Sequence, residues 1–470
     1  MAETLFAGRC VDGDIALCEA ALSTQCFLKL VELGVPFPRN RYGEYIGYKT
    51  DHDPRRRATS VGPYTSKQMT ECLERAVLAK GVPILDKTQV IKILADSGTV
   101  CGLLCLNTAA QDAADRFTLI RCKNVIWATG GPAGMYADSV YPFSQYGATG
   151  LALEAGARGK NLTEWQYGLA SVALRWNVSG TYMQVLPRVY STAADGSDER
   201  EFLMDFFSDV HDMLSNLFLK GYQWPFDVRK IADGSSIIDI LVYQETCKGR
   251  RVYLDYRTNP VGGAFTYDAL LPEAREYLTC AGACFGTPIE RLAQMNQPAI
   301  DFYRDKGVDL YTQPLEIALC AQHNNGGIGI DCWWQTDVKG PFAVGEAAAS
   351  HGVYRPGGTA LNAGQVGSTR AAQYIAARCR GDASAGFDAA ASAALAEMAA
   401  LTDACRADSR GDRTVSYEVA VGTEPTTECT LHKMVDICTE GNCLAGEFCP
   451  AESIVQKGYL DYVREDYGES

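Results

Sequence analysis

Two short apolar runs that end at glycine restrict this chain to few folds. Residues 125–127 lead directly into the sequence Ala-Thr-Gly-Gly at 128–131, and residues 342–344 lead into Gly345 and Glu346. Such a run is typical of a fully buried strand, and glycines after a strand let a ligand approach the backbone closely. We therefore expect an α/β fold with Gly-punctuated strand ends.

The composition is that of a globular protein. Of 470 residues, 47% are hydrophobic and 21% are charged, which excludes extended disorder, collagen and coiled coil. The net charge of −14 opposes binding to nucleic acid or to an anionic membrane. Neither a membrane-spanning run nor the pattern of a secretory signal is visible. We therefore expect no membrane insertion, a cytoplasmic location and free thiols for most of the 18 cysteines.

The order of the elements predicts a domain inserted into another domain. Apolar periodicity predicts helices at 14–33 and 66–80, and alternation with turn residues predicts a strand meander at 89–127. Aromatic-rich, short mixed elements follow before Gly-punctuated α/β sequence returns. The expected divisions are an α/β domain formed by 1–163 and 319–378, an inserted α+β domain at 164–318, and a helical, Cys-rich and partly irregular segment at 379–470.

Several short motifs follow one another along the chain. Each of them alone is a weak signal, but their order and spacing together are specific. They are Ile126-Trp-Ala-Thr-Gly-Gly, Gly150-Leu-Ala-Leu-Glu-Ala-Gly-Ala, Gly249-Arg-Arg-Val-Tyr-Leu-Asp, His323-Asn-Asn-Gly-Gly-Ile and His351-Gly-Val-Tyr-Arg-Pro-Gly-Gly-Thr-Ala-Leu. Together they resemble the flavoprotein subunits of fumarate reductase, succinate dehydrogenase and L-aspartate oxidase. The resemblance implies a Rossmann-like FAD-binding domain, a capping domain inserted into it, and a substrate held where the cap meets the flavin.

The resemblance also implies which residues bind FAD. Glu346 follows a strand end, where one carboxylate can accept hydrogen bonds from both hydroxyls of a ribose, and an exposed loop acid is the alternative. Residues 357–361 open a helix whose N–H groups and positive dipole end would stabilise negative charge on a reduced flavin ring. The expected FAD-binding residues are Ala128, Thr129, Gly130, Gly131, Glu346, Gly358, Thr359, Ala360 and Leu361.

One half of the family's cofactor site has no counterpart here. The family begins with a strand and a Gly-x-Gly-x-x-Gly turn, whose glycines seat the pyrophosphate on a helix N-terminus. The sole Gly-x-Gly of this chain is Gly327-Ile-Gly329, far downstream. We therefore expect the first βαβ unit to be missing, through truncation or loss, and we expect this chain to hold FAD weakly.

The substrate residues of the family are also changed. Fumarate reductases have a His-Pro-Thr where this chain has Gln166-Tyr167-Gly168-Leu169, a proton-donating arginine where it has Ser235 and Ser236, and a second histidine at the place of Gln322. The substrate-binding arginine is kept as Arg355. Fumarate reduction needs a positioned proton donor and cationic partners for two carboxylates. We therefore expect the substrate to be a small organic acid or unsaturated compound other than fumarate or succinate.

Two histidines flank the expected flavin site, so the catalytic candidates are Arg355, His323 and His351, although structural roles for both histidines are equally open. An electron-donor protein is a possible partner besides the small-molecule substrate. The alternative function is that of a degenerate, non-catalytic paralogue that serves as a partner subunit.

The spacing of Cys429, Cys438, Cys443 and Cys449 matches neither zinc nor ferredoxin patterns, so no metal is expected.

Overall fold

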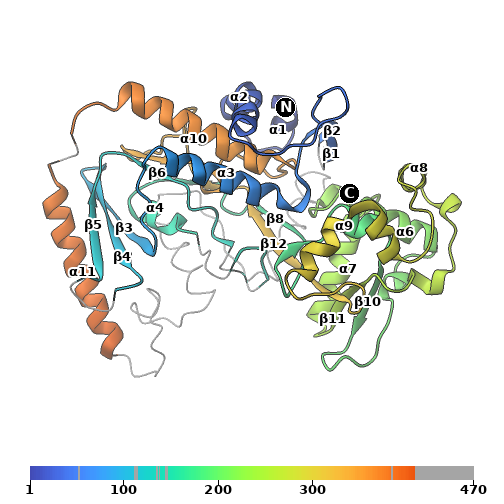
Figure 1. Cartoon of the computed structure of the whole chain (residues 1–470). Helices are drawn as coiled ribbons and strands as arrows, with labels where there is room; N and C mark the ends of the chain where they lie inside the picture. Colours follow the sequence, from blue (N-terminus) through green and yellow to red (C-terminus); the bar gives the residue numbers. More distant parts are fainter. Residues whose placement is uncertain are drawn as a thin grey trace, which may run out of the picture.

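The computed structural model describes residues 1–407 except 51–52, 111–114, 134–135, 137, 143–146 and 383–384. The four tail cysteines, and the part of the predicted C-terminal segment after 407, lie outside the described residues. Figure 1 shows two lobes, with the strands β8 and β12 running between them. No helix within the described ranges has the length and apolar character needed to cross a bilayer.

The first lobe is built around a parallel pair of strands, β6 (Val125–Trp127) and β14 (Pro341–Ala343), in which Phe342 lies opposite Ile126. Parallel strands end at the same edge of a sheet, so residues 128–131 and Glu346 lie side by side. The pair is covered by α2 (Gly13–Glu32) and α10 (Thr359–Arg378), which pack against each other. The mixed helical and strand structure confirms the α/β prediction.

Local sequence explains where these helices start. The Asp12 side chain accepts hydrogen bonds from the backbone N–H groups of Asp14 and Ile15, at 2.9 and 3.3 Å, and so caps α2. The predicted helix at 66–80 is α3 (Thr65–Ala79), which agrees with the sequence within one residue at each end. Near these helices lie α1 (Ala2–Phe6), β1 (Tyr48–Thr50), β2 (Asp53–Ala58), α4 (Thr149–Glu154), β7 (Gly159–Lys160) and β13 (Gly327–Ile328).

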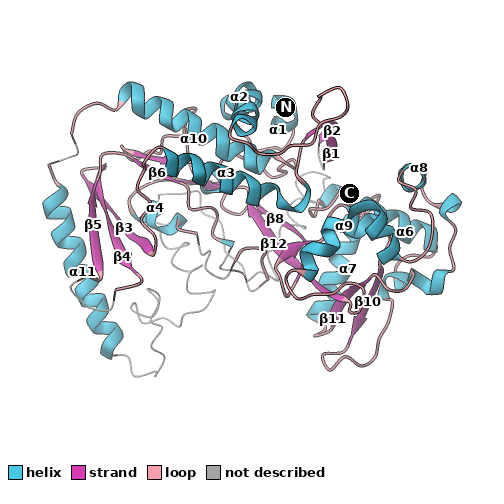
Figure 2. Cartoon of the chain, in the orientation of Figure 1, coloured by secondary structure: helices cyan, strands magenta, loops and turns pink. Residues whose placement is uncertain are grey.

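Three strands of the predicted meander form an antiparallel sheet, β3 (Thr88–Asp96), β4 (Thr99–Asn107) and β5 (Phe117–Arg121), but the extension of the meander to residue 127 was wrong, because 125–127 is β6 and pairs with β14 instead. One face of this sheet packs on α11 (Phe387–Ala407), and Leu94, Leu104 and Ala394 belong to one buried cluster there. Figure 2 shows α11 lying along this sheet. The Ala-rich sequence of α11 keeps its buried face small, which allows the helix to lie close to the strands.

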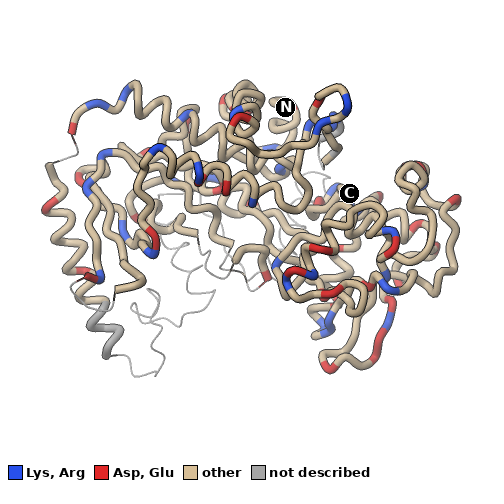
Figure 3. Tube along the Cα trace, viewed as in Figure 1, with Lys and Arg blue, Asp and Glu red and all other residues tan. Residues whose placement is uncertain are grey.

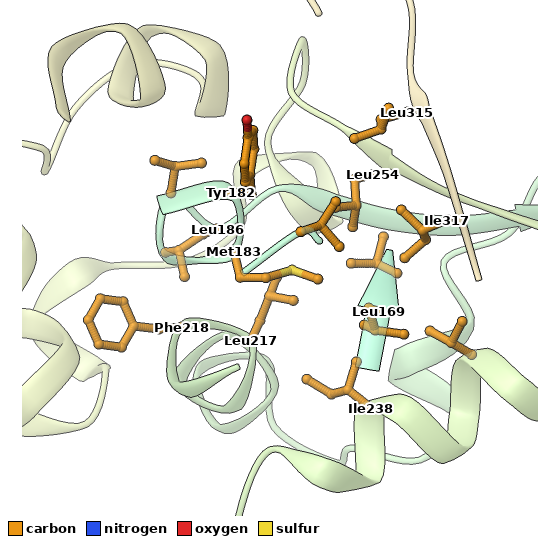
Figure 4. Close-up of a cluster of buried hydrophobic side chains, with 14 of the residues drawn as sticks. Leu169, Tyr182, Met183, Leu186, Leu217, Phe218, Ile238, Leu254, Leu315 and Ile317 are labelled. Atoms are coloured by element: carbon orange, nitrogen blue, oxygen red, sulfur yellow. The ribbon is translucent and has the colours of Figure 1, made fainter. Parts of the chain in front are cut away.

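The second lobe contains a five-stranded antiparallel sheet in the order β10-β11-β12-β8-β9. Figure 4 shows its buried core, in which Leu169 of β8 and Ile317 of β12 face Met183 and Leu217 from the helices. Its strands are β8 (Trp165–Ser171), β9 (Trp176–Asn177), β10 (Arg188–Thr192), β11 (Arg251–Asp255) and β12 (Leu315–Asn324). Its helices are α5 (Thr181–Gln184), α6 (Val210–Leu219), α7 (Ser236–Cys247), α8 (Pro272–Cys280) and α9 (Pro288–Arg304).

The buried clusters suggest how the chain divides. One cluster consists mainly of residues between Tyr167 and Ala321, with a few from 133–141, and another joins residues between Ile15 and Ala157 to residues between Ile328 and Ala371. On this ground we propose the inserted-domain division given above. The boundary at 318–319 falls inside β12, whose last residues reach the first lobe and place Asn324 beside Glu346.

Candidate active site

A cavity of about 1330 Å³ lies where the start of α10 meets the second lobe. Its walls come from α2, from the β1–β2 segment, from residues 355–362 and from the second lobe. Of the residues expected to bind cofactor or substrate, it is lined by Arg355, Gly358, Thr359, Ala360 and Leu361.

The start of α10 is shaped for an electronegative group. Gly358 has φ = 81°, a left-handed conformation that glycine adopts without strain, and it caps the helix without a side-chain hydrogen bond. The Thr359 hydroxyl donates to the Pro356 carbonyl at 2.6 Å, which fixes the turn before the helix. The helix has 20 residues, so its first turn presents both free backbone N–H groups and the positive end of the helix dipole.

Arg355 is held by a neutral partner from the second lobe. Gln166 Oε1 on β8 accepts hydrogen bonds from Arg355 Nε at 3.0 Å and from Nη2 at 2.6 Å. Arg355 Nη1 donates to the Pro356 carbonyl at 3.1 Å. Because an amide carries no charge, Gln166 orients the guanidinium without cancelling its charge. Sequence reasoning gave Gln166 no role, since 189 positions separate the two residues.

Two further arginines extend the positive charge around the cavity. Arg56 and Arg57 of β2 line it and are exposed. Figure 3 shows Lys and Arg residues along the β1–β2 segment. In a chain with a net charge of −14, cations gathered at one cavity favour an anionic ligand there.

The two candidate histidines lie behind Arg355, and neither is among the residues that line this cavity. The rings of His323 and His351 are 5.3 Å apart between centroids, and His323 Nδ1 lies 2.9 Å from Asn325 Oδ1. Burial, together with the charge of Arg355, lowers the pKa of His351 to about 3 and holds the pKa of His323 well below its usual value. Both rings are therefore neutral near pH 7, and their catalytic roles stay predictions.

Glu346 and residues 128–131, at the end of β6, form a second group of candidate residues. None of them lines this cavity. Glu346 Oε1 accepts the backbone N–H of Asn324 at 2.8 Å. A Cβ at Gly131 would lie 2.5 Å from that oxygen, so glycine alone fits without a shift of Glu346. Burial raises the pKa of Glu346 to about 7, and the backbone N–H groups of Asn324 and Gly131 offset part of that rise. One of the two carboxylate oxygens is thus already held by the protein.

Unpartnered polar atoms near this second group indicate a polar ligand. Asn324 is buried, and neither its Oδ1 nor its Nδ2 has a hydrogen-bond partner among the described residues. A buried amide without partners is costly, by roughly 1–3 kcal/mol. The Asn324 amide, the cavity and the start of α10 together fit a large cofactor with polar and anionic parts.

The FAD binding domain family matches residues 7–216 and 228–361 of the chain. The chain belongs to this family. The match indicates FAD as the cofactor, as the resemblance implied. The strand-end glycines, Glu346 and the start of α10 all fall within the matched residues of this FAD binding domain.

Relatives agree with the resemblance drawn from the motifs. The chain is 24% identical over 387 residues to L-aspartate oxidase of Mesorhizobium japonicum, covering 81% of this chain and 64% of that protein. It is 24% identical over 352 residues to a fumarate reductase (CoM/CoB) subunit of Methanothermobacter marburgensis, covering 73% and 54%. The chain therefore spans less than two thirds of the length of these relatives.

A substituted form of E. coli quinol fumarate reductase has the same fold. It superposes with a TM-score of 0.63 at 18% identity, covering 99% of this chain and 76% of that chain. The likeness confirms the predicted fold class, an FAD-binding domain of the fumarate reductase flavoprotein type with a capping domain.

Proposed function

We propose that this chain is the main part of a flavin-dependent oxidoreductase that acts on a small organic acid or unsaturated substrate other than fumarate or succinate. The observation that carries the proposal is Arg355. It is a buried cation on the wall of a large cavity, adjacent to the start of α10. Such a cation binds one carboxylate, and the N–H groups of α10 are suited to the ring of the cofactor.

The cofactor and the protein have separate tasks in this proposal. Bound FAD would supply the transfer of an electron pair to or from the substrate. The first turn of α10, from Gly358 to Leu361, would hold the flavin ring, and residues 128–131 with Glu346 would hold the ribose. Arg355 would bind and orient the substrate carboxylate, and Gln166 would keep the guanidinium in place.

The other substrate anchors of a fumarate reductase have no cationic replacement at the matching positions. Gly168 has no side chain, and Gln322 uses its Nε2 to donate to the Gly168 carbonyl at 2.8 Å. The Ser235 hydroxyl donates to the Gln223 carbonyl at 3.4 Å. Loss of a positioned proton donor reduces a rate by roughly 10²- to 10⁴-fold, so fumarate and succinate are poor candidates.

One observation bears on the alternative, a partner subunit without its own catalysis, because it concerns how complete the cofactor site is. The Val125 N–H donates to the Gly340 carbonyl at 3.1 Å, and the Trp127 carbonyl accepts from the Val344 N–H at 2.9 Å. The backbone N–H and C=O of Ile126, between them, therefore point to the opposite edge of β6. No strand among the described residues pairs with that edge, and Ile126 is 42% exposed. An unpaired edge beside the strand-end glycines favours a cofactor site that needs a further segment, whether from the same protein or from a partner.

Reconstitution tests the proposal. The chain is purified, its flavin absorbance is measured, and FAD is added with and without an N-terminal strand carrying Gly-x-Gly-x-x-Gly. We expect weak flavin retention that improves with the added segment. With reduced viologen as the electron donor, we expect turnover of some unsaturated acids in a panel, and loss of that turnover in Arg355→Met. Arg378→Met, at the far end of α10, is the matched control. Bound flavin without turnover of any acid would favour the non-catalytic alternative, and rapid fumarate turnover would contradict the exclusion of fumarate.

A further inference from the structure

The indole of Trp224 takes the place of a side chain at position 168. A Cβ on Gly168 would lie 2.9 Å from Trp224 Cε2 and 3.0 Å from Cζ2. The ring is fixed there because Trp224 Nε1 donates to the Leu169 carbonyl at 3.1 Å. Trp224 also lines the cavity that contains Arg355. The Trp224 ring therefore occupies the space that a side chain at position 168 would fill.

The strand β8 sets the separation between this ring and Arg355. Gln166 and Gly168 are two residues apart, so they lie on the same face of the strand, about 6.5–7 Å from each other. Gln166 holds Arg355, and Gly168 lies under Trp224. The guanidinium and the indole thus lie over the same face of one strand, at positions two residues apart, and both line the cavity.

The second-lobe wall of the cavity has further aromatic residues, which alternate with polar ones such as Gln184 and Asn296. Trp176 and Tyr222 also line the cavity, and Trp176 is held against Phe302 with ring centroids 4.3 Å apart. The single donor of Trp224 is occupied by the Leu169 carbonyl. A second carboxylate at this end would therefore be desolvated against indole carbon, which is unfavourable, whereas an aromatic ring would pack there.

From this geometry we propose that the cavity binds an aryl-substituted monocarboxylic acid of the arylacrylate class, with its carboxylate on Arg355 and its ring against Trp224. The inference rests on the proposed function in that it names the substrate class of the same site. It differs from that function because it concerns binding, which can be measured whether or not the flavin is in place.

Calorimetric titration of the full chain, with and without added FAD, tests the inference with four probes. Trans-cinnamate has both groups, crotonate lacks the ring, cinnamyl alcohol lacks the carboxylate, and fumarate has a second carboxylate in place of the ring. We expect cinnamate to bind at least about tenfold more tightly than each of the other three, because ring packing and a charge-assisted hydrogen bond are each worth about tenfold. Equal affinities for cinnamate and crotonate, or tighter binding of fumarate, would overturn the inference.

Variants identify the ring site. Trp224→Leu should weaken cinnamate binding about tenfold and leave crotonate binding unchanged, whereas Trp224→Phe should keep most of the cinnamate affinity. Trp333→Phe is the matched control, since Trp333 does not line the cavity. Its ring packs instead against Arg370, whose Cζ lies 3.8 Å from the ring centroid. Equal effects of Trp224→Leu and Trp333→Phe would argue against the ring site. If Trp224→Leu does not fold, as judged by circular dichroism, the four probes and Trp224→Phe still decide.

Binding and turnover separate the two proposals. Cinnamate binding without viologen turnover of any acid would leave the ligand site standing and remove the enzymatic proposal. Turnover of other acids without cinnamate binding would do the reverse.

Discussion

Replacement of Glu19 by glutamine should remove a large pH dependence from the stability of the first lobe. Glu19 lies on α2 and is fully buried, and neither of its carboxylate oxygens has a hydrogen-bond partner among the described residues. Burial raises the pKa of Glu19 from 4.5 to about 8, while the neighbouring Ser350 hydroxyl lowers it by less. Folding thus favours the protonated acid.

The sign and the size follow from proton linkage. Between pH 4.5 and about 8 the unfolded chain binds fewer protons at Glu19 than the folded chain, so the free energy of unfolding falls as the pH rises. Each pKa unit is worth about 1.4 kcal/mol, so the full shift corresponds to a loss on the order of 5 kcal/mol across this window. The stabilisation is complete below pH 4.5 and is lost as the pH passes through about 8.

The assay is urea unfolding of wild type and Glu19→Gln between pH 5 and 8.5, followed by ellipticity and tryptophan fluorescence. At pH 5 the protonated Glu19 and the amide of the variant are both uncharged polar groups in the same buried site, so their costs are similar. We therefore expect similar stabilities at pH 5 and a more stable variant at pH 8.5.

Glu32→Gln is the control on the same helix. Glu32 is exposed and pairs with Lys29 at 2.9 Å, an arrangement that contributes little to stability. Its pH profile should follow that of wild type. Parallel profiles for Glu19→Gln and wild type would refute the reasoning about the buried carboxyl.

Two further substitutions test the packing around the site and in the cap. Gly131→Ala should lower stability by about 1–3 kcal/mol in thermal unfolding, because its Cβ would lie 2.5 Å from Glu346 Oε1. Gly150→Ala, with open space at its Cβ, should not lower it, and equal losses would contradict the steric argument. Lys220→Met should destabilise the cap by roughly 3–5 kcal/mol, because it leaves the Asp239 carboxyl without its cationic partner in a site where both residues are fully buried. Lys220→Met combined with Asp239→Leu should recover most of that loss in urea unfolding, and no recovery would show that the unpaired carboxyl is not the cause.

The candidate site was predictable where its residues are close in sequence. Residues 128–131 follow a strand, and 358–361 open a helix, so their local patterns indicate a strand end and a helix N-terminus without any knowledge of the rest. Arg355 could be singled out through the resemblance, in which it matches the substrate-binding arginine of the family. The contacts that give Arg355 its orientation could not, since Gln166 belongs to a strand from a different lobe.

The histidines show the limit of motif reasoning. His323 and His351 belong to recognisable motifs, but the motifs carry no information on burial. The structure places both rings behind Arg355 in surroundings that keep them neutral. The free energy of ionising a side chain depends on solvent and on neighbouring charges, and both are set by the packed fold.

The sequence by itself determined the α/β class, the approximate bounds of elements such as α2 and α3 and, through the resemblance, the cofactor. These properties depend on local patterns, because a glycine after a strand or a proline before a helix acts on its neighbours in the chain. Tertiary structure alone decided that Trp224 fills the space above Gly168, 56 positions away, and that this ring shares a cavity with Arg355. Which side chains meet across a strand is fixed by packing between distant segments, and that packing shapes the ligand that the cavity can hold.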